Sequence, residues 1–442
     1  MGSRTAFGFV AALSGFALSS AALADAPLSS SNVFDYEARA GVSYSDNVTR
    51  TPGRDFNSVA SVLGGRLQAR RPEGRLRYDA AGDLSYYRYL KSAVGGQLFG
   101  GIKGNAIYDI VADSVSWGAQ ASYNQIKQDL QRPVALGNLE DVISLSTGPT
   151  FRLRFGSTLE ATLEGRFALT DFSKRSFDNQ TVGGKFIIAK RLSPSSLVGL
   201  GGSADRLSYS KQIGLGSKDF DRREVFVRYG TEFVRTRISF DAGSSTLKGG
   251  NVDDSKPLVR ANVAHRISPS LSFFGDYTQE FAASDAGIYV PAPATGPATG
   301  AITSILTGGP RTIKSYRGGM IFKRPRTTVE IGLSRYDEAS LGPLPLTRAT
   351  DEFLAKATRL ITPRSHGSAY GRYSDDKSST QLFQSKGYEV GIEYGLLFDK
   401  LLGINCRVEH AHRTSLTPSS NFTETSIGLF VTYGRAVNAD RQ

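Results

Sequence analysis

Apolar residues recur at every second position in many separate segments of the chain. The segment 159–169 alternates Leu, Ala, Gly and Phe residues with Glu160, Thr162, Glu164 and Arg166. An equivalent apolar row is formed by Val115, Trp117, Ala119, Ala121 and Tyr123. Because successive side chains of a strand point to opposite faces, each segment predicts a β-strand with one apolar and one polar face.

The repetition of this pattern indicates the class of β-protein. The segments 225–233, 271–277, 390–396 and 427–433 alternate in the same way. Strands of about ten residues with one charged face leave no dry core for a soluble sandwich, but they suit a barrel with lipid outside and water inside. Beyond the first 24 residues no run of about 18 apolar residues occurs, which excludes ordinary spanning helices. The expected fold is all-β, a transmembrane antiparallel up-and-down β-barrel.

Short and long connections alternate along the chain, as they do in outer-membrane barrels. With a first strand near 33–45 and a last near 423–436, the turns predict about 18–20 strands. The short turns fall at 71–74, 111–113, 155–157, 193–195, 235–237, 268–270, 324–326, 362–364 and 398–400. Longer polar stretches fall at 46–57, 127–139, 209–221, 248–256 and 284–311, and we expect them at the outer surface.

The stretch 284–311 is the longest of these connections. Within it, the Pro- and Gly-rich composition of 288–310 excludes a strand. We expect a surface loop. A loop folded into the lumen, where it would narrow the pore, is the alternative.

The N-terminal segment has the features of an export signal. Arg4 precedes an apolar run over 6–18, and Ala22 and Ala24 supply the small residues that cleavage requires. Residues 1–24 are therefore predicted to be a signal peptide, and residues 25–442 a single barrel domain in the outer membrane of a Gram-negative cell. Ala24 and Ala26 offer a second cleavage register.

Composition narrows the class of function. The formal net charge is +12, yet no basic cluster with interleaved aromatic residues stands out, so we expect no nucleic-acid partner. Cys406 is the single cysteine, which excludes an internal disulfide. The mean hydropathy of −0.23 is compatible with a barrel, because lipid-facing and lumen-facing residues average out.

Catalytic motifs are missing from the sequence. It contains no nucleophile elbow, phosphate-binding loop or HExxH motif. His410 and His412 would share one face of a strand, but no third ligand follows at a recognisable spacing. We therefore expect no enzyme, and we assign no catalytic, cofactor or metal residue.

The polar face of the alternating strands predicts the lumen lining, and it mixes both signs of charge. Arginine ladders there would favour anions, or they would pair with neighbouring acids and support a wet lumen, which we favour. The candidate lumen-lining residues are Arg39, Arg66, Arg70, Arg75, Arg77, Arg152, Arg166, Glu160, Glu164, Arg228, Glu232, Glu389 and Glu393.

The first predicted strand carries a resemblance to a known family. Ser31-Asn32-Val33-Phe34, followed by Gly41-Val42-Ser43-Tyr44-Ser45-Asp46-Asn47-Val48, resembles the start of the β-barrel porin type 2 family, with its Tyr-x-Asp-Asn element. The resemblance implies an outer-membrane barrel, often encoded beside exopolysaccharide or capsule machinery, with no established catalytic residues. One departure is the C-terminal segment 434–442, which does not end on the aromatic residue that many outer-membrane barrels carry.

Two functions are compatible with these features. The first is a channel for exopolysaccharide or small solutes, and Arg75, Arg77, Tyr78 and Tyr86 hint at a polymer track. The alternative is a structural or adhesive barrel that anchors its outer loops. The expected partners are outer-membrane lipid, polysaccharide, periplasmic export machinery and the barrel-insertion machinery.

Overall fold

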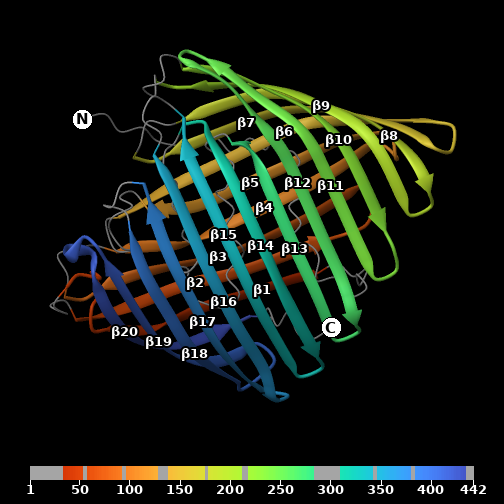
Figure 1. The fold of residues 1–442 in the computed structure, drawn as a ribbon. Helices are drawn as coiled ribbons and strands as arrows, with labels where there is room; N and C mark the ends of the chain where they lie inside the picture. Colours follow the sequence, from red (N-terminus) through yellow and green to blue (C-terminus); the bar gives the residue numbers. More distant parts are fainter. Residues whose placement is uncertain are drawn as a thin grey trace, which may run out of the picture.

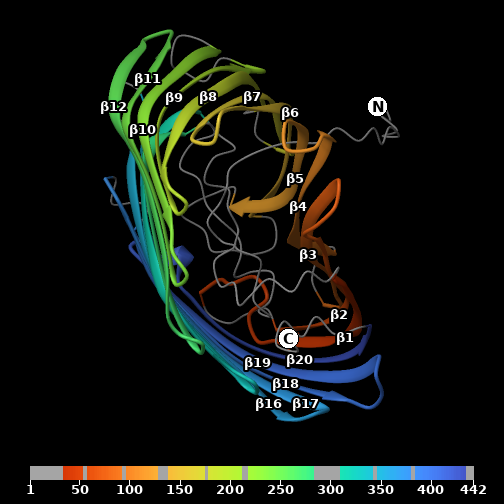
Figure 2. The ribbon, with the colours of Figure 1, turned by 90° about the vertical axis from the view of Figure 1, so that its right-hand side faces the viewer.

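The computed structural model describes residues 33–52, 57–91, 96–127, 138–174, 178–211, 218–282, 309–341, 346–379 and 384–434. Twenty β-strands in these ranges form one antiparallel sheet that closes on itself (Figures 1 and 2). The predicted barrel and its upper strand count are thereby confirmed. The expected signal peptide, 1–24, and almost all of the 284–311 connection lie outside the described residues.

The strands follow one another around the barrel in chain order. Their bounds are β1 Val33–Ser45, β2 Ser58–Arg71, β3 Leu76–Tyr89, β4 Gln97–Val111, β5 Val115–Lys127, β6 Leu139–Phe155, β7 Leu159–Phe172, β8 Asn179–Ser193, β9 Ser196–Tyr209 and β10 Asp219–Glu232. The second half comprises β11 Thr236–Gly249, β12 Val252–Ser268, β13 Leu271–Ala282, β14 Arg311–Arg324, β15 Thr327–Ser340, β16 Thr347–Thr362, β17 Ser365–Ser378, β18 Ser385–Leu397, β19 Leu402–Ser415 and β20 Phe422–Tyr433.

The seam that closes the barrel joins its first and last strands, which lie side by side in Figure 2. β1 pairs with β20 from Ala38 opposite Tyr433 to Ser45 opposite Ser426. The other face of β1 pairs with β2 over its whole length. Among the twenty described strands, closure leaves no unpaired sheet edge, which is the condition for a sheet to survive in lipid.

All nine predicted short turns lie at one end of the barrel, and the predicted first strand has the observed bounds. Two predictions are wrong in detail. The 248–256 stretch is a tight hairpin rather than a long connection, because β11 runs to Gly249 and β12 begins at Val252. The last strand ends at Tyr433, since Gly434 leaves the sheet with a φ of 150°.

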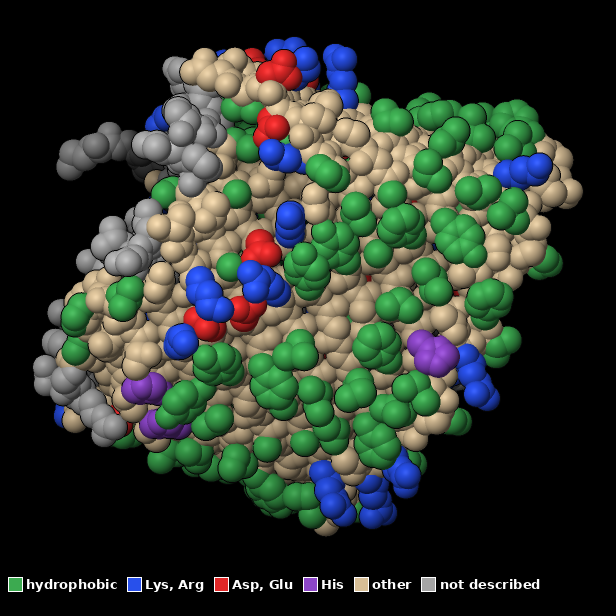
Figure 3. Space-filling model, in the orientation of Figure 1, with side chains coloured by type: hydrophobic (Ala, Val, Ile, Leu, Met, Phe, Trp, Pro, Cys, Tyr) green, Lys and Arg blue, Asp and Glu red, His purple; other side chains and the backbone are tan. Residues whose placement is uncertain are grey.

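Large apolar side chains cover the outer wall of the barrel (Figure 3). Val225 and Leu63, which are 70% and 66% exposed, belong to this surface. The alternating rows read from the sequence supply it, since Trp117, Leu163 and Ile392 are also exposed. An apolar band of this kind is the outer surface of a transmembrane barrel.

Helical structure contributes almost nothing to the described residues. The 3₁₀ turn η3, Pro418–Ser420, connects β19 to β20. Within the described ranges, no helix has the length and apolar character needed to span a membrane.

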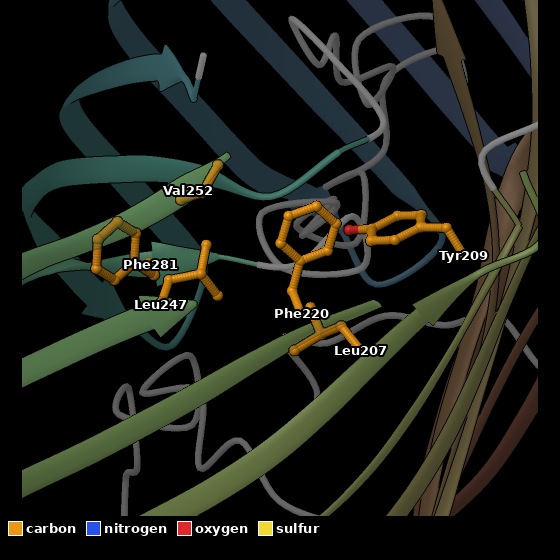
Figure 4. Close-up of a cluster of buried hydrophobic side chains, with 6 residues drawn as sticks. All are labelled: Leu207, Tyr209, Phe220, Leu247, Val252 and Phe281. Atoms are coloured by element: carbon orange, nitrogen blue, oxygen red, sulfur yellow. The ribbon is translucent and has the colours of Figure 1, made fainter. Parts of the chain in front are cut away.

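A buried apolar cluster lies at the long-connection end of β9 to β13 (Figure 4). Tyr209 and Phe220 meet edge to face, with ring centroids 6.0 Å apart. Leu207, which is 1% exposed, lies opposite Phe220 in the strand register. The cluster is completed by Leu247, Val252 and Phe281. Apolar packing thus joins neighbouring hairpins at the long-connection end of the barrel.

Candidate channel interior

The strand register places the candidate lumen residues on the inner face, with one exception. Arg39 of β1 lies opposite Gly64, and two positions away Glu37 lies opposite Arg66 of β2. The same alternation, read against the exposed apolar rows, turns the following residues inward: Arg39, Arg66, Arg70, Arg77, Arg152, Arg166, Glu160, Glu164, Arg228, Glu232, Glu389 and Glu393. Arg75 instead lies in the exposed turn between β2 and β3.

Asp83 of β3 is the centre of the first inner-face ion-pair network. Its side chain is 3% exposed and pairs with the guanidinium groups of Arg39 and Arg66. Arg66 donates through Nε and Nη2 at 3.1 and 3.0 Å. The network thereby connects the three neighbouring strands β1, β2 and β3 along the inner face of the wall. Charge-assisted hydrogen bonds of this kind are stronger than neutral ones.

A second network spans β9, β10, β12 and β13. Arg222 pairs with Asp205 at 2.6 Å and donates to the carbonyl of Phe281 at 3.0 Å. Arg260 lies between Glu224 and Glu280, at 3.0 and 2.5 Å. On β10 and β11, Arg228 and Asp241 add a bidentate pair with distances of 2.7 and 2.6 Å.

A third network follows the long-connection end of β14 to β17. Arg311 and Glu338 pair at 2.9 Å, and both side chains are 0% exposed. Arg348 pairs with Asp376 at 2.6 Å. A buried charge is costly unless it is paired and hydrogen-bonded. Removal of either member of one of these pairs would therefore leave its partner as an uncompensated buried charge.

Most ion pairs of the inner-face arginines thus join two different strands. Arg77 and Asp109 lie 3.0 Å apart, and Arg70 and Asp79 lie 3.8 Å apart. The arrangement agrees with the reading of the arginine ladders as paired rather than free. It provides alternating local dipoles rather than a field of one sign.

Aromatic side chains accompany the charges near the seam. Tyr87 of β3 meets Phe99 of β4 edge to face at 5.4 Å. Tyr370 of β17 donates its hydroxyl to Glu409 at 2.9 Å, and the Arg407 guanidinium lies 5.8 Å from the centre of the Phe430 ring. On the inner face between β17 and β4, aromatic rings therefore lie beside paired charges. The rings of Phe99 and Phe430 are buried, whereas those of Tyr87 and Tyr370 are half-buried.

Two residues expected in a polymer track are on the other face. Tyr78 and Tyr86 share the outward parity of Leu76 and Leu84, and Tyr86 is 44% exposed. Tyr78 and Tyr86 are close to Arg77 in the sequence, but the period of two places them on the opposite face of the strand. Counted from Asp83, the same period predicts that Tyr87 faces inward.

The Tyr-x-Asp-Asn element acts structurally at the seam. Asp46 Oδ1 accepts a hydrogen bond from the Thr425 N–H at 2.7 Å, and Asn47 Nδ2 donates to the carbonyls of Thr51 and Thr423 at 2.7 and 3.1 Å. Asn47 is 0% exposed. These bonds fold the connection after β1 onto β20.

Arg50, in the same connection, completes this corner. It donates through Nε to Glu424 at 2.6 Å and lies over the Phe422 ring. Burial alone lowers the pKa of Arg50, but the carboxylates of Glu424, Glu389 and Glu409 raise it by more, so the net pKa lies above its ordinary value. The guanidinium therefore stays charged.

The histidine pair lies on the outer face. His410 and His412 share hydrogen bonds with Thr425 and Thr423 at 3.0 and 2.9 Å, and both rings lie near Tyr388. In the part of the chain that the structure describes, no group of three or more His, Cys, Asp or Glu residues is arranged to hold a metal ion.

Comparison with known proteins gives only remote structural similarity. No family model matches the sequence, and no curated protein matches it. Among solved structures, the siderophore receptor PirA from Pseudomonas aeruginosa is similar at 9% identity and a TM-score of 0.45, over 91% of this chain and 81% of that one. The FrpB iron transporter from Neisseria meningitidis (9%, 0.45, 90% and 81%) and the ferric citrate transporter FecA (11%, 0.45, 90% and 78%) are similar to the same degree.

Proposed function

We propose that this protein is an outer-membrane channel that passes exopolysaccharide. The observation that carries the proposal is the inner face near the seam, where aromatic rings lie beside paired charges. Sugars stack their apolar faces on aromatic rings, and their hydroxyls exchange hydrogen bonds with charged groups. Passage of small solutes is the second use that the same polar interior would allow.

The membrane location is supported by the closed sheet and its apolar outer wall. Cys406 offers a direct test, because this single cysteine is exposed and shares the outward face of β19 with Val408. In intact outer membranes, Cys406 should not react with a membrane-impermeant maleimide, whereas it should react after unfolding. The matched control is Ser43→Cys in a Cys406→Ser background, since Ser43 lies on the inner face of β1 and should react in the membrane.

Channel activity is tested by planar-bilayer recording of protein purified from the outer membrane of a Gram-negative host. We expect steady conductance that anionic polysaccharide fragments reduce on addition. A Tyr87→Ala variant should conduct ions but lose about tenfold in block by the polymer, whereas the outward variant Tyr86→Ala should keep it. Conductance without any polymer block would favour small solutes. No conductance would favour a barrel that anchors its outer connections.

A further inference from the structure

A row of charged side chains crosses the outer wall over β14 to β18, and Figure 3 shows it as a diagonal run of blue and red beside the apolar band. The register places Arg335 opposite Asp351, Asp351 opposite Asp375, and Asp375 opposite Lys386. These positions have the outward parity of exposed Leu333, which is 62% exposed. The outer charged row consists of Lys314, Arg335, Asp337, Asp351, Asp375, Lys377 and Lys386.

Ion pairs organise this row while its basic groups stay open to a ligand. Arg335 pairs with Asp337 at 3.0 Å and with Asp351 at 3.6 Å. Lys377 lies 3.0 Å from Asp351 and 3.4 Å from Asp375. The Arg335 and Lys377 side chains are 49% and 53% exposed, so donor groups remain available. Exposed ion pairs of this kind add little to the free energy of unfolding, so folding stability does not explain why these charged residues cluster.

An apolar groove of about 880 Å³ adjoins the row on the outer wall. Arg335 and Asp351 of the row belong to its lining. A parallel set of apolar side chains lies two residues along each strand from the row, on the side of the short turns. In the register, Leu333 lies opposite Phe353, Phe353 opposite Tyr373, and Tyr373 opposite Tyr388. The outward side chains that line the groove include Phe240, Phe273, Tyr316, Leu333, Phe353 and Tyr373.

From this juxtaposition we propose that the outer wall binds one phosphorylated membrane lipid, with an acyl chain in the groove and its phosphate on the outer charged row. Basic residues outnumber acidic ones in the row, and charge-assisted hydrogen bonds from Arg and Lys suit a phosphate. The groove supplies the apolar surface that a chain requires, and the row lies at the edge of the apolar band where headgroups begin. The inference rests on the proposed membrane location.

The test is native mass spectrometry of the protein purified from the outer membrane in mild detergent, titrated with lipid A and, separately, with phosphatidylcholine. The triple variant Arg335→Gln, Lys377→Gln, Lys386→Gln should lose at least tenfold in lipid A retention. The matched control, Lys190→Gln, Arg324→Gln, Arg359→Gln, removes the same charge from outward positions near the short turns and should retain lipid A. Unchanged retention in the triple variant, or an equal loss in the control, would overturn the proposal.

The groove has its own variant. Gly318→Phe places a ring in it, and there is room at this position because the nearest atom to an added Cβ is 3.6 Å away. Lipid A retention should fall about tenfold although the outer charged row is intact. Unchanged retention would contradict binding of the acyl chain in the groove. A dimeric parent protein and a monomeric triple variant, with lipid retention unchanged, would overturn the lipid site and identify the surface as a contact between copies. Maleimide protection of Cys406 in the same preparations reports membrane location separately, so a failed lipid site and a failed membrane assignment are distinguishable.

Discussion

Asp46 and Thr425 are joined by a reciprocal pair of hydrogen bonds at the point where the barrel closes. The Asp46 carboxylate accepts from the Thr425 N–H at 2.7 Å, and the Asp46 N–H donates to the Thr425 carbonyl at 3.1 Å. The pair continues the β1–β20 ladder beyond Ser45, its last residue pair. A side chain thus extends the seam where regular pairing stops.

Removing this carboxylate should weaken the closure. Asp46→Ala leaves the Thr425 N–H without its acceptor, which should lower the free energy of unfolding by about 1–2 kcal/mol. Urea unfolding followed by tryptophan fluorescence and by the heat-dependent shift in gel mobility measures the change. Asp79→Ala is the control, because Asp79 is half exposed, lies 3.8 Å from Arg70 and should change stability by less than about 0.5 kcal/mol. Equal effects of the two substitutions would refute a special role for the seam.

The sequence was sufficient for the fold because its period of two reports directly on the two sides of a barrel wall. The same parity turned Arg39, Arg66 and Glu393 inward, but it fails where strands end, as Arg75 in its turn illustrates. Pairing could not be predicted: Arg39 and Asp83 are 44 residues apart and lie on β1 and β3, and only the stagger of the intervening strand brings them together. The outer charged row could not be predicted for a similar reason, since its residues come from five strands.

Asp83 holds two guanidinium groups, so neutralising it should have a cost beyond one lost contact. Asp83→Asn leaves Arg39 and Arg66 facing each other without a shared acid, and we expect destabilisation of about 2–3 kcal/mol. The measurement is again urea unfolding. Glu160→Gln, which removes an exposed partner 3.9 Å from Arg154, is the matched control and should be near neutral. An Arg39→Leu, Arg66→Leu, Asp83→Leu variant that is as stable as the parent would agree with this account, whereas a neutral Asp83→Asn would contradict it.

Gly148 lies where the β6–β7 ladder is interrupted. The register runs from Thr147 opposite Phe167 directly to Thr150 opposite Glu164, and a Cβ on Gly148 would lie 1.8 Å from the Gly165 carbonyl oxygen. Gly148→Ala must therefore push the two strands apart, with an expected loss of about 2 kcal/mol or a lower yield of folded barrel. At Gly104 the nearest atom is 3.5 Å away, so Gly104→Ala should fold normally. Folded yield in the outer membrane, read from gel mobility before and after heating, checks both substitutions.

The ion selectivity of the proposed channel should respond to Glu389 and Glu393, which face inward on β18. Because many inner-face arginines are paired with carboxylates, we expect weak selectivity in the parent protein. Glu389→Gln, Glu393→Gln removes two negative charges from the wall and should move the reversal potential in a KCl gradient toward chloride, with the permeability ratio changing by about twofold. Asp337→Asn is the control, since this carboxylate lies on the outer wall and should leave the reversal potential unchanged. A shift toward potassium, or an equal shift in the control, would mean that the current does not pass along the inner face of β18.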